Sequence, residues 1–320
     1  MLTDPGDVVV IPAPSYPMYT NDLGLKTGAE RFNLQTHHQL EEMPAQGPVT
    51  TALLDTVHKE LTAKGKRFKI LLLTTPDNPT GIVYEAETLR DIARWCERHH
   101  VHMVVNEIYG LSKIDLEDEV LRADYPNSGA SVSFAKIMRE MDSAYLHMWY
   151  ALSKDFAMSG LRVGVVHSLN PGFMKAFENA NVPHLVSNLT QWAIGELLKD
   201  VDFVKAYIPK NRKHLTKSYR LVVTHLRKNE IPYVAAKGSF FVWADFSKYL
   251  SAHTDAGQEK LWLEIYRNTG VLLTPGEGFG HEKKGMFRIV FTAVPFSYLS
   301  VAMERLTSYL QARLENTTPQ

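Results

Sequence analysis

The sequence predicts an α/β protein with a mostly parallel central sheet and a smaller C-terminal α+β unit, and two observations carry this prediction. Short apolar runs such as FKILLLT (68–74) alternate with amphipathic helical segments such as 85–100. From Gly238 onwards the pattern changes to short strands that flank two further helices. Strands that alternate with helices are typical of parallel sheets whose faces are covered by helices.

The predicted elements follow one another along the whole chain. The opening LTDPGDVVVIPAPSYP is expected to form a turn, a strand and a proline-rich loop, and further strands are expected at 68–74, 101–105, 144–150 and 162–168. Helical patterns fill 171–230, and later strands are expected at 239–246, 271–276 and 287–292, with helices at 258–269 and 296–314. We therefore expect a large domain at 1–205 and a small domain at 206–320, hinged by the long helix near 202–228.

Composition excludes several classes of function. The 320 residues contain 35 Lys plus Arg and 35 Asp plus Glu, so no net charge recruits nucleic acid or an anionic membrane. No apolar run approaches the length of a membrane span, and the first residues lack the features of a signal peptide. The single Cys96 excludes an internal disulfide and is expected to be buried in a helix. A cytoplasmic protein is the expectation.

Three polar motifs follow predicted strands. PDNPTG (76–81), NEIY (106–109) and ALSK (151–154) each stand where the carboxyl end of a strand is expected. In parallel sheets the ligand site lies at these strand ends. Lys154 in the third motif suits a partly desolvated amine that acts as a nucleophile, although a solvated lysine at a helix start is the ordinary alternative.

These motifs resemble the fold-type I enzymes that use pyridoxal 5′-phosphate (PLP), in particular class I/II aminotransferases and the related 1-aminocyclopropane-1-carboxylate synthases. The resemblance rests on PDNPTG, NEIY, SKDFAMSGLRVG (153–164) and FRIVFT (287–292), and LTDPGDVVVIPAPSYPMYTNDL at the start resembles the synthase branch. It covers essentially the whole chain in the family's order and spacing. It implies an aspartate aminotransferase-like fold, an α-amino acid substrate and a homodimer.

The resemblance also implies a role for individual residues. Lys154 would form the Schiff base with PLP and then act as the base at the substrate Cα. Arg162 and Ser153 would bind the cofactor phosphate, for which a guanidinium offers a forked donor. Tyr109 and Asn78 would donate to the phenolic oxygen of the cofactor.

Two further residues complete the implied site. Tyr16 corresponds to the aromatic residue that stacks on the pyridine ring, and Arg288 would bind the substrate α-carboxylate through two hydrogen bonds. Each of these residues also has an ordinary structural interpretation. Tyr16 can be a core aromatic, the arginines can form surface salt bridges, and NPTG can be a plain turn.

Asn106 departs from the family, which has an aspartate at this position. The acid pairs with the pyridine nitrogen and keeps it protonated, whereas an amide can donate only to an unprotonated nitrogen. The loss of a charge-assisted hydrogen bond costs about 1.5–3 kcal/mol, and about 1.4 kcal/mol is a factor of ten in rate. Glu107 is no substitute, because neighbouring strand residues face opposite ways.

Three other features bear on the resemblance. Ala151 stands where the family usually has a serine, which removes one possible phosphate hydroxyl. The family's upstream glycine-containing loop, whose amides bind the phosphate, has no counterpart before Met1, so we expect weakened cofactor retention. The segment VSNLTQ (186–191) resembles the part that reaches the cofactor of the neighbouring subunit.

The sequence leaves several functions open. One is a PLP-dependent enzyme that carries out transamination or the γ-elimination of the synthase branch. Another is a degenerate homologue that binds PLP, an amino acid or a partner subunit without useful turnover. Tyr150 and Lys154 have the spacing of short-chain dehydrogenases, but the glycine-rich turn of that family is absent. His99, His100 and His102 are expected to form a solvated face, and no metal site is predicted.

Overall fold

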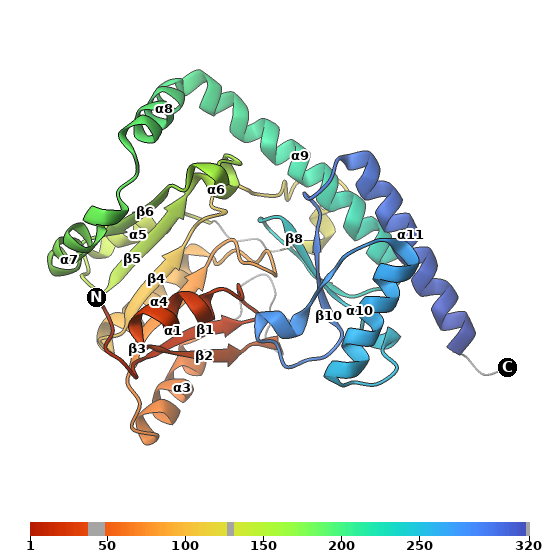
Figure 1. The fold of residues 1–320 in the computed structure, drawn as a ribbon, viewed down its shortest axis with the longest axis horizontal. Helices are drawn as coiled ribbons and strands as arrows, with labels where there is room; N and C mark the ends of the chain where they lie inside the picture. Colours follow the sequence, from red (N-terminus) through yellow and green to blue (C-terminus); the bar gives the residue numbers. More distant parts are fainter. Residues whose placement is uncertain (38–48, 127–130, 318–320) are drawn as a thin grey trace.

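A computed structural model describes residues 1–37, 49–126 and 131–317. It contains two β-sheets, one of six strands and one of four. In Figure 1 the larger sheet occupies the left half of the view and the smaller sheet lies to its right. The predicted α/β class with a mostly parallel sheet and a smaller second unit is confirmed.

The larger sheet is parallel except at one edge. Its order is β2 (Glu30–Gln35), β1 (Val8–Ala13), β3 (Phe68–Thr74), β4 (His102–Asn106), β5 (Leu146–Ala151) and β6 (Gly164–Ser168). Strand β6 runs antiparallel to β5. The segment between them holds only the short helices α6 (Leu152–Asp155) and η2 (Ser159–Leu161). A parallel return needs a crossover of a dozen or more residues, so this short connection reverses the chain.

Helices cover both faces of this sheet. Helices α3 (Thr51–Ala63), α4 (Ala86–Arg98) and α5 (Phe134–Met141) pack on one face in a continuous apolar core. Cys96 is fully buried there, as predicted. Helix α1 (Tyr19–Thr27) covers the other face through a smaller cluster. Both faces are therefore apolar, which is why strands such as β3 are almost continuous runs of leucine and isoleucine.

The smaller sheet is antiparallel. Its order is β7 (Tyr233–Val234), β8 (Phe241–Asp245), β10 (Met286–Val290) and β9 (Thr274–Pro275). Helices α9 (Val201–Lys228), α10 (Asp255–Thr269) and α11 (Phe296–Thr317) share one apolar core with it. The short helices η4 (Ser247–Tyr249) and η5 (Gly276–Phe279) complete this part. The expected domain boundary at 205/206 falls inside α9 and stays a prediction.

One segment is poorly covered by the rest of the described structure. Helices α7 (Pro171–Asn181) and α8 (Asn188–Lys199) contain no buried residue, and neither do residues 201–214 of α9. In Figure 1 helix α8 and the start of α9 lie at the periphery. The remaining short helices are η1 (Arg122–Asp124) and η3 (Val182–His184). None of the helices in the described ranges has the length and apolar composition needed to cross a bilayer.

The strand register places polar side chains in one row. Thr74 at the end of β3 pairs with Asn106 at the end of β4, and Asn106 pairs with Trp149 near the end of β5. These strands are parallel, so their carboxyl ends meet at the same edge of the sheet. This edge faces the smaller sheet across the site described next.

Candidate active site

A cavity of about 490 Å³ lies at the carboxyl ends of the central strands, between the two sheets. Six of the eight residues predicted from the sequence line it, and they come from five separate parts of the chain: Tyr16, Asn78, Asn106, Tyr109, Lys154 and Arg288. For Asn78, Asn106, Tyr109 and Lys154, a common location was expected from motifs that follow strands, whereas Tyr16 and Arg288 were expected here from the resemblance. Their individual chemical roles stay predictions.

Lys154 reaches the cavity from helix α6, which begins directly after β5. The residue is partly buried. Tyr150, four residues earlier, instead lines a separate cavity of about 550 Å³. The Tyr150 hydroxyl donates to Oδ2 of Asp155 at 3.1 Å. The dehydrogenase arrangement would require Tyr150 and Lys154 to face one cavity, but here they line two different cavities.

Tyr109 is buried beside the aromatic rings of the smaller sheet. Its ring meets those of Phe240 and Phe241 edge to face, with centroids 5.2 and 5.7 Å apart. Burial raises the pKa of the Tyr109 hydroxyl, and the nearby charge of Arg288 opposes that rise in part. The hydroxyl therefore stays protonated at neutral pH and can donate a hydrogen bond into the cavity.

Arg288 links the smaller sheet to the larger one. From strand β10 its Nη1 donates to Oδ1 of Asn78 at 2.9 Å, and its Nη2 donates to Oγ1 of Thr274 at 3.4 Å. The guanidinium also stacks on the rings of Phe241 and Phe279. Its buried Nε has no hydrogen-bond partner in the described part of the chain. An arginine held in this way has donor capacity left for an anion.

Asn106 is held by two hydrogen bonds at the end of β4. Its Oδ1 accepts from the main-chain N–H of Ile108 at 3.0 Å, and its Nδ2 donates to the Tyr19 hydroxyl at 2.9 Å. The Tyr19 hydroxyl also lies 2.9 Å from Oγ1 of Thr74. Sequence reasoning did not include Tyr19. Its position three residues after Tyr16, at the start of a helix, is the signal that was available.

Glu107 faces away from the cavity, as predicted from strand alternation. Its carboxylate accepts from the main-chain N–H of Phe134 at 2.6 Å and from the Ser133 hydroxyl at 2.7 Å. These groups form the N-terminus of α5, where a carboxylate satisfies free N–H groups. Burial raises the pKa of Glu107, and these hydrogen bonds oppose the rise. Glu107 is therefore a helix-capping residue.

Ser153 and Arg162 do not line this cavity. Arg162 is exposed, follows η2 in the left-handed backbone region (φ 55°), and donates from Nη1 to the Ser159 carbonyl at 2.9 Å. Ser187 of the VSNLTQ segment caps α8 through the Thr190 N–H. The phosphate role expected for Ser153 and Arg162 stays a prediction, and in this structure neither is joined to the cavity that Lys154 lines.

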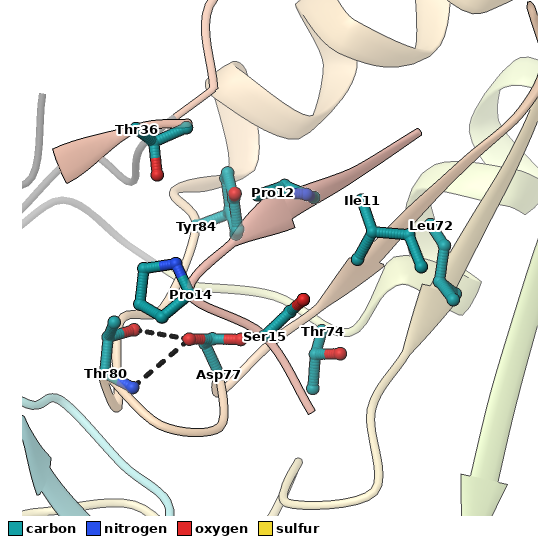
Figure 2. Close-up of a pocket in the computed structure, with 10 residues that line it drawn as sticks. All are labelled: Ile11, Pro12, Pro14, Ser15, Thr36, Leu72, Thr74, Asp77, Thr80 and Tyr84. Carbon is teal, nitrogen blue, oxygen red and sulfur yellow. Dashed lines mark hydrogen bonds between the residues drawn. The ribbon is translucent and has the colours of Figure 1, made fainter. Parts of the chain in front are cut away.

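A second, much smaller cavity of about 10 Å³ lies beneath the loop that carries Asn78, a volume that suits about one water molecule. Figure 2 shows Asp77 in its wall, joined by two hydrogen bonds to Thr80. Burial raises the pKa of Asp77 to about 6, and the bonds from Thr80 oppose this rise. Thr74 lines both cavities. The Asp77 side chain therefore holds Thr80 within this loop through two hydrogen bonds.

The histidines near β4 differ from the expected solvated face. His102 is buried, and its Nδ1 lies 3.0 Å from Nε2 of His147, which is also buried. His99 stacks on Trp95 instead. The expectation of a solvated face is wrong for His102, because its position in β4 turns its ring toward β5. No cluster of potential metal ligands occurs within residues 1–37, 49–126 and 131–317.

Comparison with known families gives a match over most of the chain. The family model for aminotransferase class I and II matches residues 1–306. The chain is 33% identical over 323 residues to 1-aminocyclopropane-1-carboxylate synthase 4 of Oryza sativa subsp. japonica, which covers 98% of this chain and 64% of that protein. It is 30% identical over 326 residues to 1-aminocyclopropane-1-carboxylate synthase-like protein 1 of Mus musculus, covering 100% of this chain and 62% of the relative.

Solved structures give the same fold. A Thermus thermophilus aspartate aminotransferase double mutant superposes with a TM-score of 0.77 at 23% identity, over 96% of this chain and 71% of that one. The aromatic aminotransferase from Pyrococcus horikoshii OT3 gives a TM-score of 0.78 at 25% identity, over 98% and 75% of the two chains. The chain thus spans somewhat under two thirds of the two curated relatives named above.

Proposed function

Because this chain belongs to the class I and II aminotransferase family, whose members use PLP, we propose that it is a PLP-dependent enzyme that acts on an α-amino acid through Lys154. The observation that supports this proposal is the convergence of Lys154, Asn106 and Arg288 on one cavity. An amine, a neutral hydrogen-bond donor and a guanidinium are thereby placed around a space large enough for a ring and an amino acid.

The residues around the cavity fit a flat polar ring and a carboxylate. One N–H of the Asn106 amide has no partner among the described residues, and the Tyr109 hydroxyl is a protonated donor. Tyr16 provides an aromatic face at the cavity wall. Arg288 lines the cavity, and its guanidinium has N–H groups beyond the two bonded to Asn78 and Thr274 that can donate to an anion. These groups suit the ring of PLP and the carboxylate of its substrate, while the residues proposed for the phosphate lie elsewhere.

PLP, when bound, supplies a carbonyl that the amine of Lys154 can attack and a ring that accepts the electrons released at the substrate Cα. Lys154 then has two tasks, covalent attachment and proton transfer at Cα. Tyr109 would donate a hydrogen bond to the phenolic oxygen. Arg288 would bind the α-carboxylate, and its bond to Asn78 holds the guanidinium in place.

Asn106 favours a second candidate, a homologue that binds cofactor and amino acid with little turnover. A neutral amide does not hold a proton on the ring nitrogen, so the ring is a weaker acceptor of electrons. The retained Lys154, Tyr109 and Arg288 favour catalysis over binding alone. We infer an active but slow enzyme.

We also propose a homodimer, formed through the poorly covered segment of α7, α8 and the start of α9. Leu189 and Trp192 of α8 are 73% and 64% exposed, and Leu185 nearby is 65% exposed. A large apolar surface of this kind is typical of a protein interface. Sedimentation should show a dimer that Trp192→Glu dissociates, while Leu25→Glu, on an 83% exposed leucine of α1, leaves it intact. A wild-type monomer would contradict this proposal.

Covalent trapping tests the proposed function directly. The purified protein is mixed with PLP, reduced with borohydride and digested, and the modified peptide is identified by mass spectrometry. We expect the pyridoxyl group on Lys154. Modification of Lys113 or Lys136 instead, or of no lysine, would remove the basis of the assignment.

A further inference from the structure

The direction of the hydrogen bonds around Asn106 can be deduced from the groups involved. The main-chain N–H of Ile108 can only donate, so the atom of the Asn106 side chain that it meets at 3.0 Å is the oxygen. The amide nitrogen therefore faces Tyr19, 2.9 Å away, and donates to its hydroxyl oxygen. This assignment follows from chemistry and not from the arbitrary choice of amide orientation.

The Tyr19 hydroxyl is in turn fixed. It accepts from Asn106 and also forms a hydrogen bond with Oγ1 of Thr74, 2.9 Å away, in which either hydroxyl can donate. Burial raises the pKa of Tyr19 to about 12, so the hydroxyl is neutral at any physiological pH. The Tyr19 ring also meets the ring of Tyr16 edge to face, with centroids 5.5 Å apart. Tyr19 thus touches both the proposed stacking residue and the amide.

One donor remains. An amide nitrogen has two hydrogens, and Tyr19 takes one of them. The oxygen of Asn106 is turned toward Ile108, from which it accepts, and the amide nitrogen keeps one N–H for a ligand. Asn106 lines the cavity together with Lys154, so this N–H is available to a ring bound there.

We propose that Tyr19 is a positioning residue that, together with the Ile108 main chain, fixes the Asn106 amide as a hydrogen-bond donor, so that the site selects a pyridine ring whose nitrogen is unprotonated. This inference rests on the proposed function, since it concerns the ring of PLP. It adds the protonation state of the ring that is bound, and it names Tyr19 as the residue that holds the Asn106 amide. Tyr19 acts through Asn106 and takes no part in bond making.

The test compares PLP with its 1-deaza analogue, in which C–H replaces the ring nitrogen while the aldehyde and phosphate are retained. Dissociation constants for both compounds are measured with wild type, Asn106→Leu and Tyr19→Phe. The affinity ratio in Asn106→Leu gives the intrinsic preference without an amide. In wild type the preference for PLP should exceed that baseline by about two- to tenfold, the value of one neutral hydrogen bond.

Tyr19→Phe should move this ratio at least halfway to the Asn106→Leu baseline, because the amide loses one of its two anchors. The control is Tyr125→Phe, which removes another buried hydroxyl, bonded to the Ala236 carbonyl in the smaller unit, and should leave the ratio unchanged. A Tyr19→Phe protein that binds both compounds more weakly at an unchanged ratio would show a packing role alone.

Two other results would be decisive. A wild-type ratio equal to the baseline would overturn the contact between Asn106 and the ring nitrogen while leaving the proposed function intact. Failure of wild type to bind either compound, together with no borohydride-trapped lysine, would overturn the proposed function itself.

Discussion

The two ends of the proposed cofactor site are built differently. At the ring end, Asn106, Tyr19 and Thr74 are joined by a chain of hydrogen bonds at the ends of buried parallel strands. At the other end, Ser153 and Arg162 lie in a short connection between two antiparallel strands, and Arg162 is exposed to solvent. Burial and hydrogen bonding among side chains therefore decrease from Asn106 toward Arg162.

This difference follows from what surrounds each end. Helices cover both faces of the sheet at the ring end, so the polar groups there must satisfy one another. The segment from α6 through α8 has few buried neighbours among the described residues, so its side chains contact solvent or local carbonyls. The ring end is built into the fold, whereas the geometry of Arg162 depends on what covers this segment.

Replacement of Lys154 should have the largest effect. Lys154→Arg keeps a cation but cannot attach to the cofactor or transfer the Cα proton, so we expect a loss of about 10²–10⁴-fold in the rate of Cα hydrogen exchange. Exchange is followed by NMR of the amino acid in D₂O. The melting temperature should hardly change, because Lys154 is only partly buried. If Lys154→Arg exchanged the Cα hydrogen at the wild-type rate, the catalytic base would be a different residue.

Asn106→Asp should increase the difference between the two ends of the site, because it strengthens the contact with the ring nitrogen. The carboxylate can hold a proton on the ring nitrogen, and a charge-assisted hydrogen bond contributes about 1.5–3 kcal/mol, or roughly ten- to more than a hundredfold in rate. The Tyr19 hydroxyl can rotate to donate to the new acid, and the Ile108 N–H still donates. Cα hydrogen exchange should accelerate while amino-acid affinity changes little. An active wild type with no gain in the variant would show that the weaker electron sink suits its reaction.

Arg288→Lys should weaken amino-acid binding by about 1.5–3 kcal/mol, because a lysine cannot form the forked pair with a carboxylate. The expected change in melting temperature is small by comparison. Titration calorimetry with the PLP-loaded protein measures the affinity, and Arg305→Lys, on α11 at a separate surface cavity, is a matched control. Equal affinities in Arg288→Lys and wild type would place the carboxylate elsewhere.

Asp77→Asn tests how the buried charge of Asp77, in the loop that carries Asn78, affects stability. The folded pKa of Asp77, about 6, lies above its ordinary 3.8, so the folded state prefers the protonated form. Its contribution to stability is therefore present below about pH 4 and is lost as the pH rises through 6. The variant keeps the bonds from Thr80 without the charge and should be more stable than wild type by about 1–3 kcal/mol at pH 8, but not at pH 4. Denaturant unfolding at both values measures the difference, and a constant difference would contradict it.

Arg162→Ala should have the smallest effect if the phosphate end is as loosely built as it is here. An exposed charge contributes about 0–1 kcal/mol, so PLP affinity should fall by about fivefold or less. Equilibrium dialysis with PLP provides the measurement. A hundredfold loss of PLP affinity would contradict the proposed difference between the two ends. It would show that Arg162 reaches the phosphate, for example once a partner subunit covers the segment.

The sequence predicted the larger features because they depend on local pattern. Asn106 and Lys154 lie at the ends of strands, as expected, since apolar runs mark the strands and these motifs follow them, and Arg288 lies within a strand of the smaller sheet. Tyr19 was missed because its importance comes from a hydrogen bond to a residue 87 positions away. The antiparallel direction of β6 was also missed, because direction depends on the path of the chain between strands and not on the strand's own residues.

The two halves of helix α9 should differ in how readily they unfold locally. Its 28 residues form one continuous helix, but every buried residue in it lies between Leu215 and Leu226. Pro209 lacks an N–H and so removes one hydrogen bond from the uncovered half. In a monomer, amide protons before residue 215 should therefore exchange with solvent far sooner than those after it. A protease that cleaves after lysine would then reach Lys205 and Lys210 ahead of any site in the buried half of the same helix, and formation of the proposed dimer should protect both lysines.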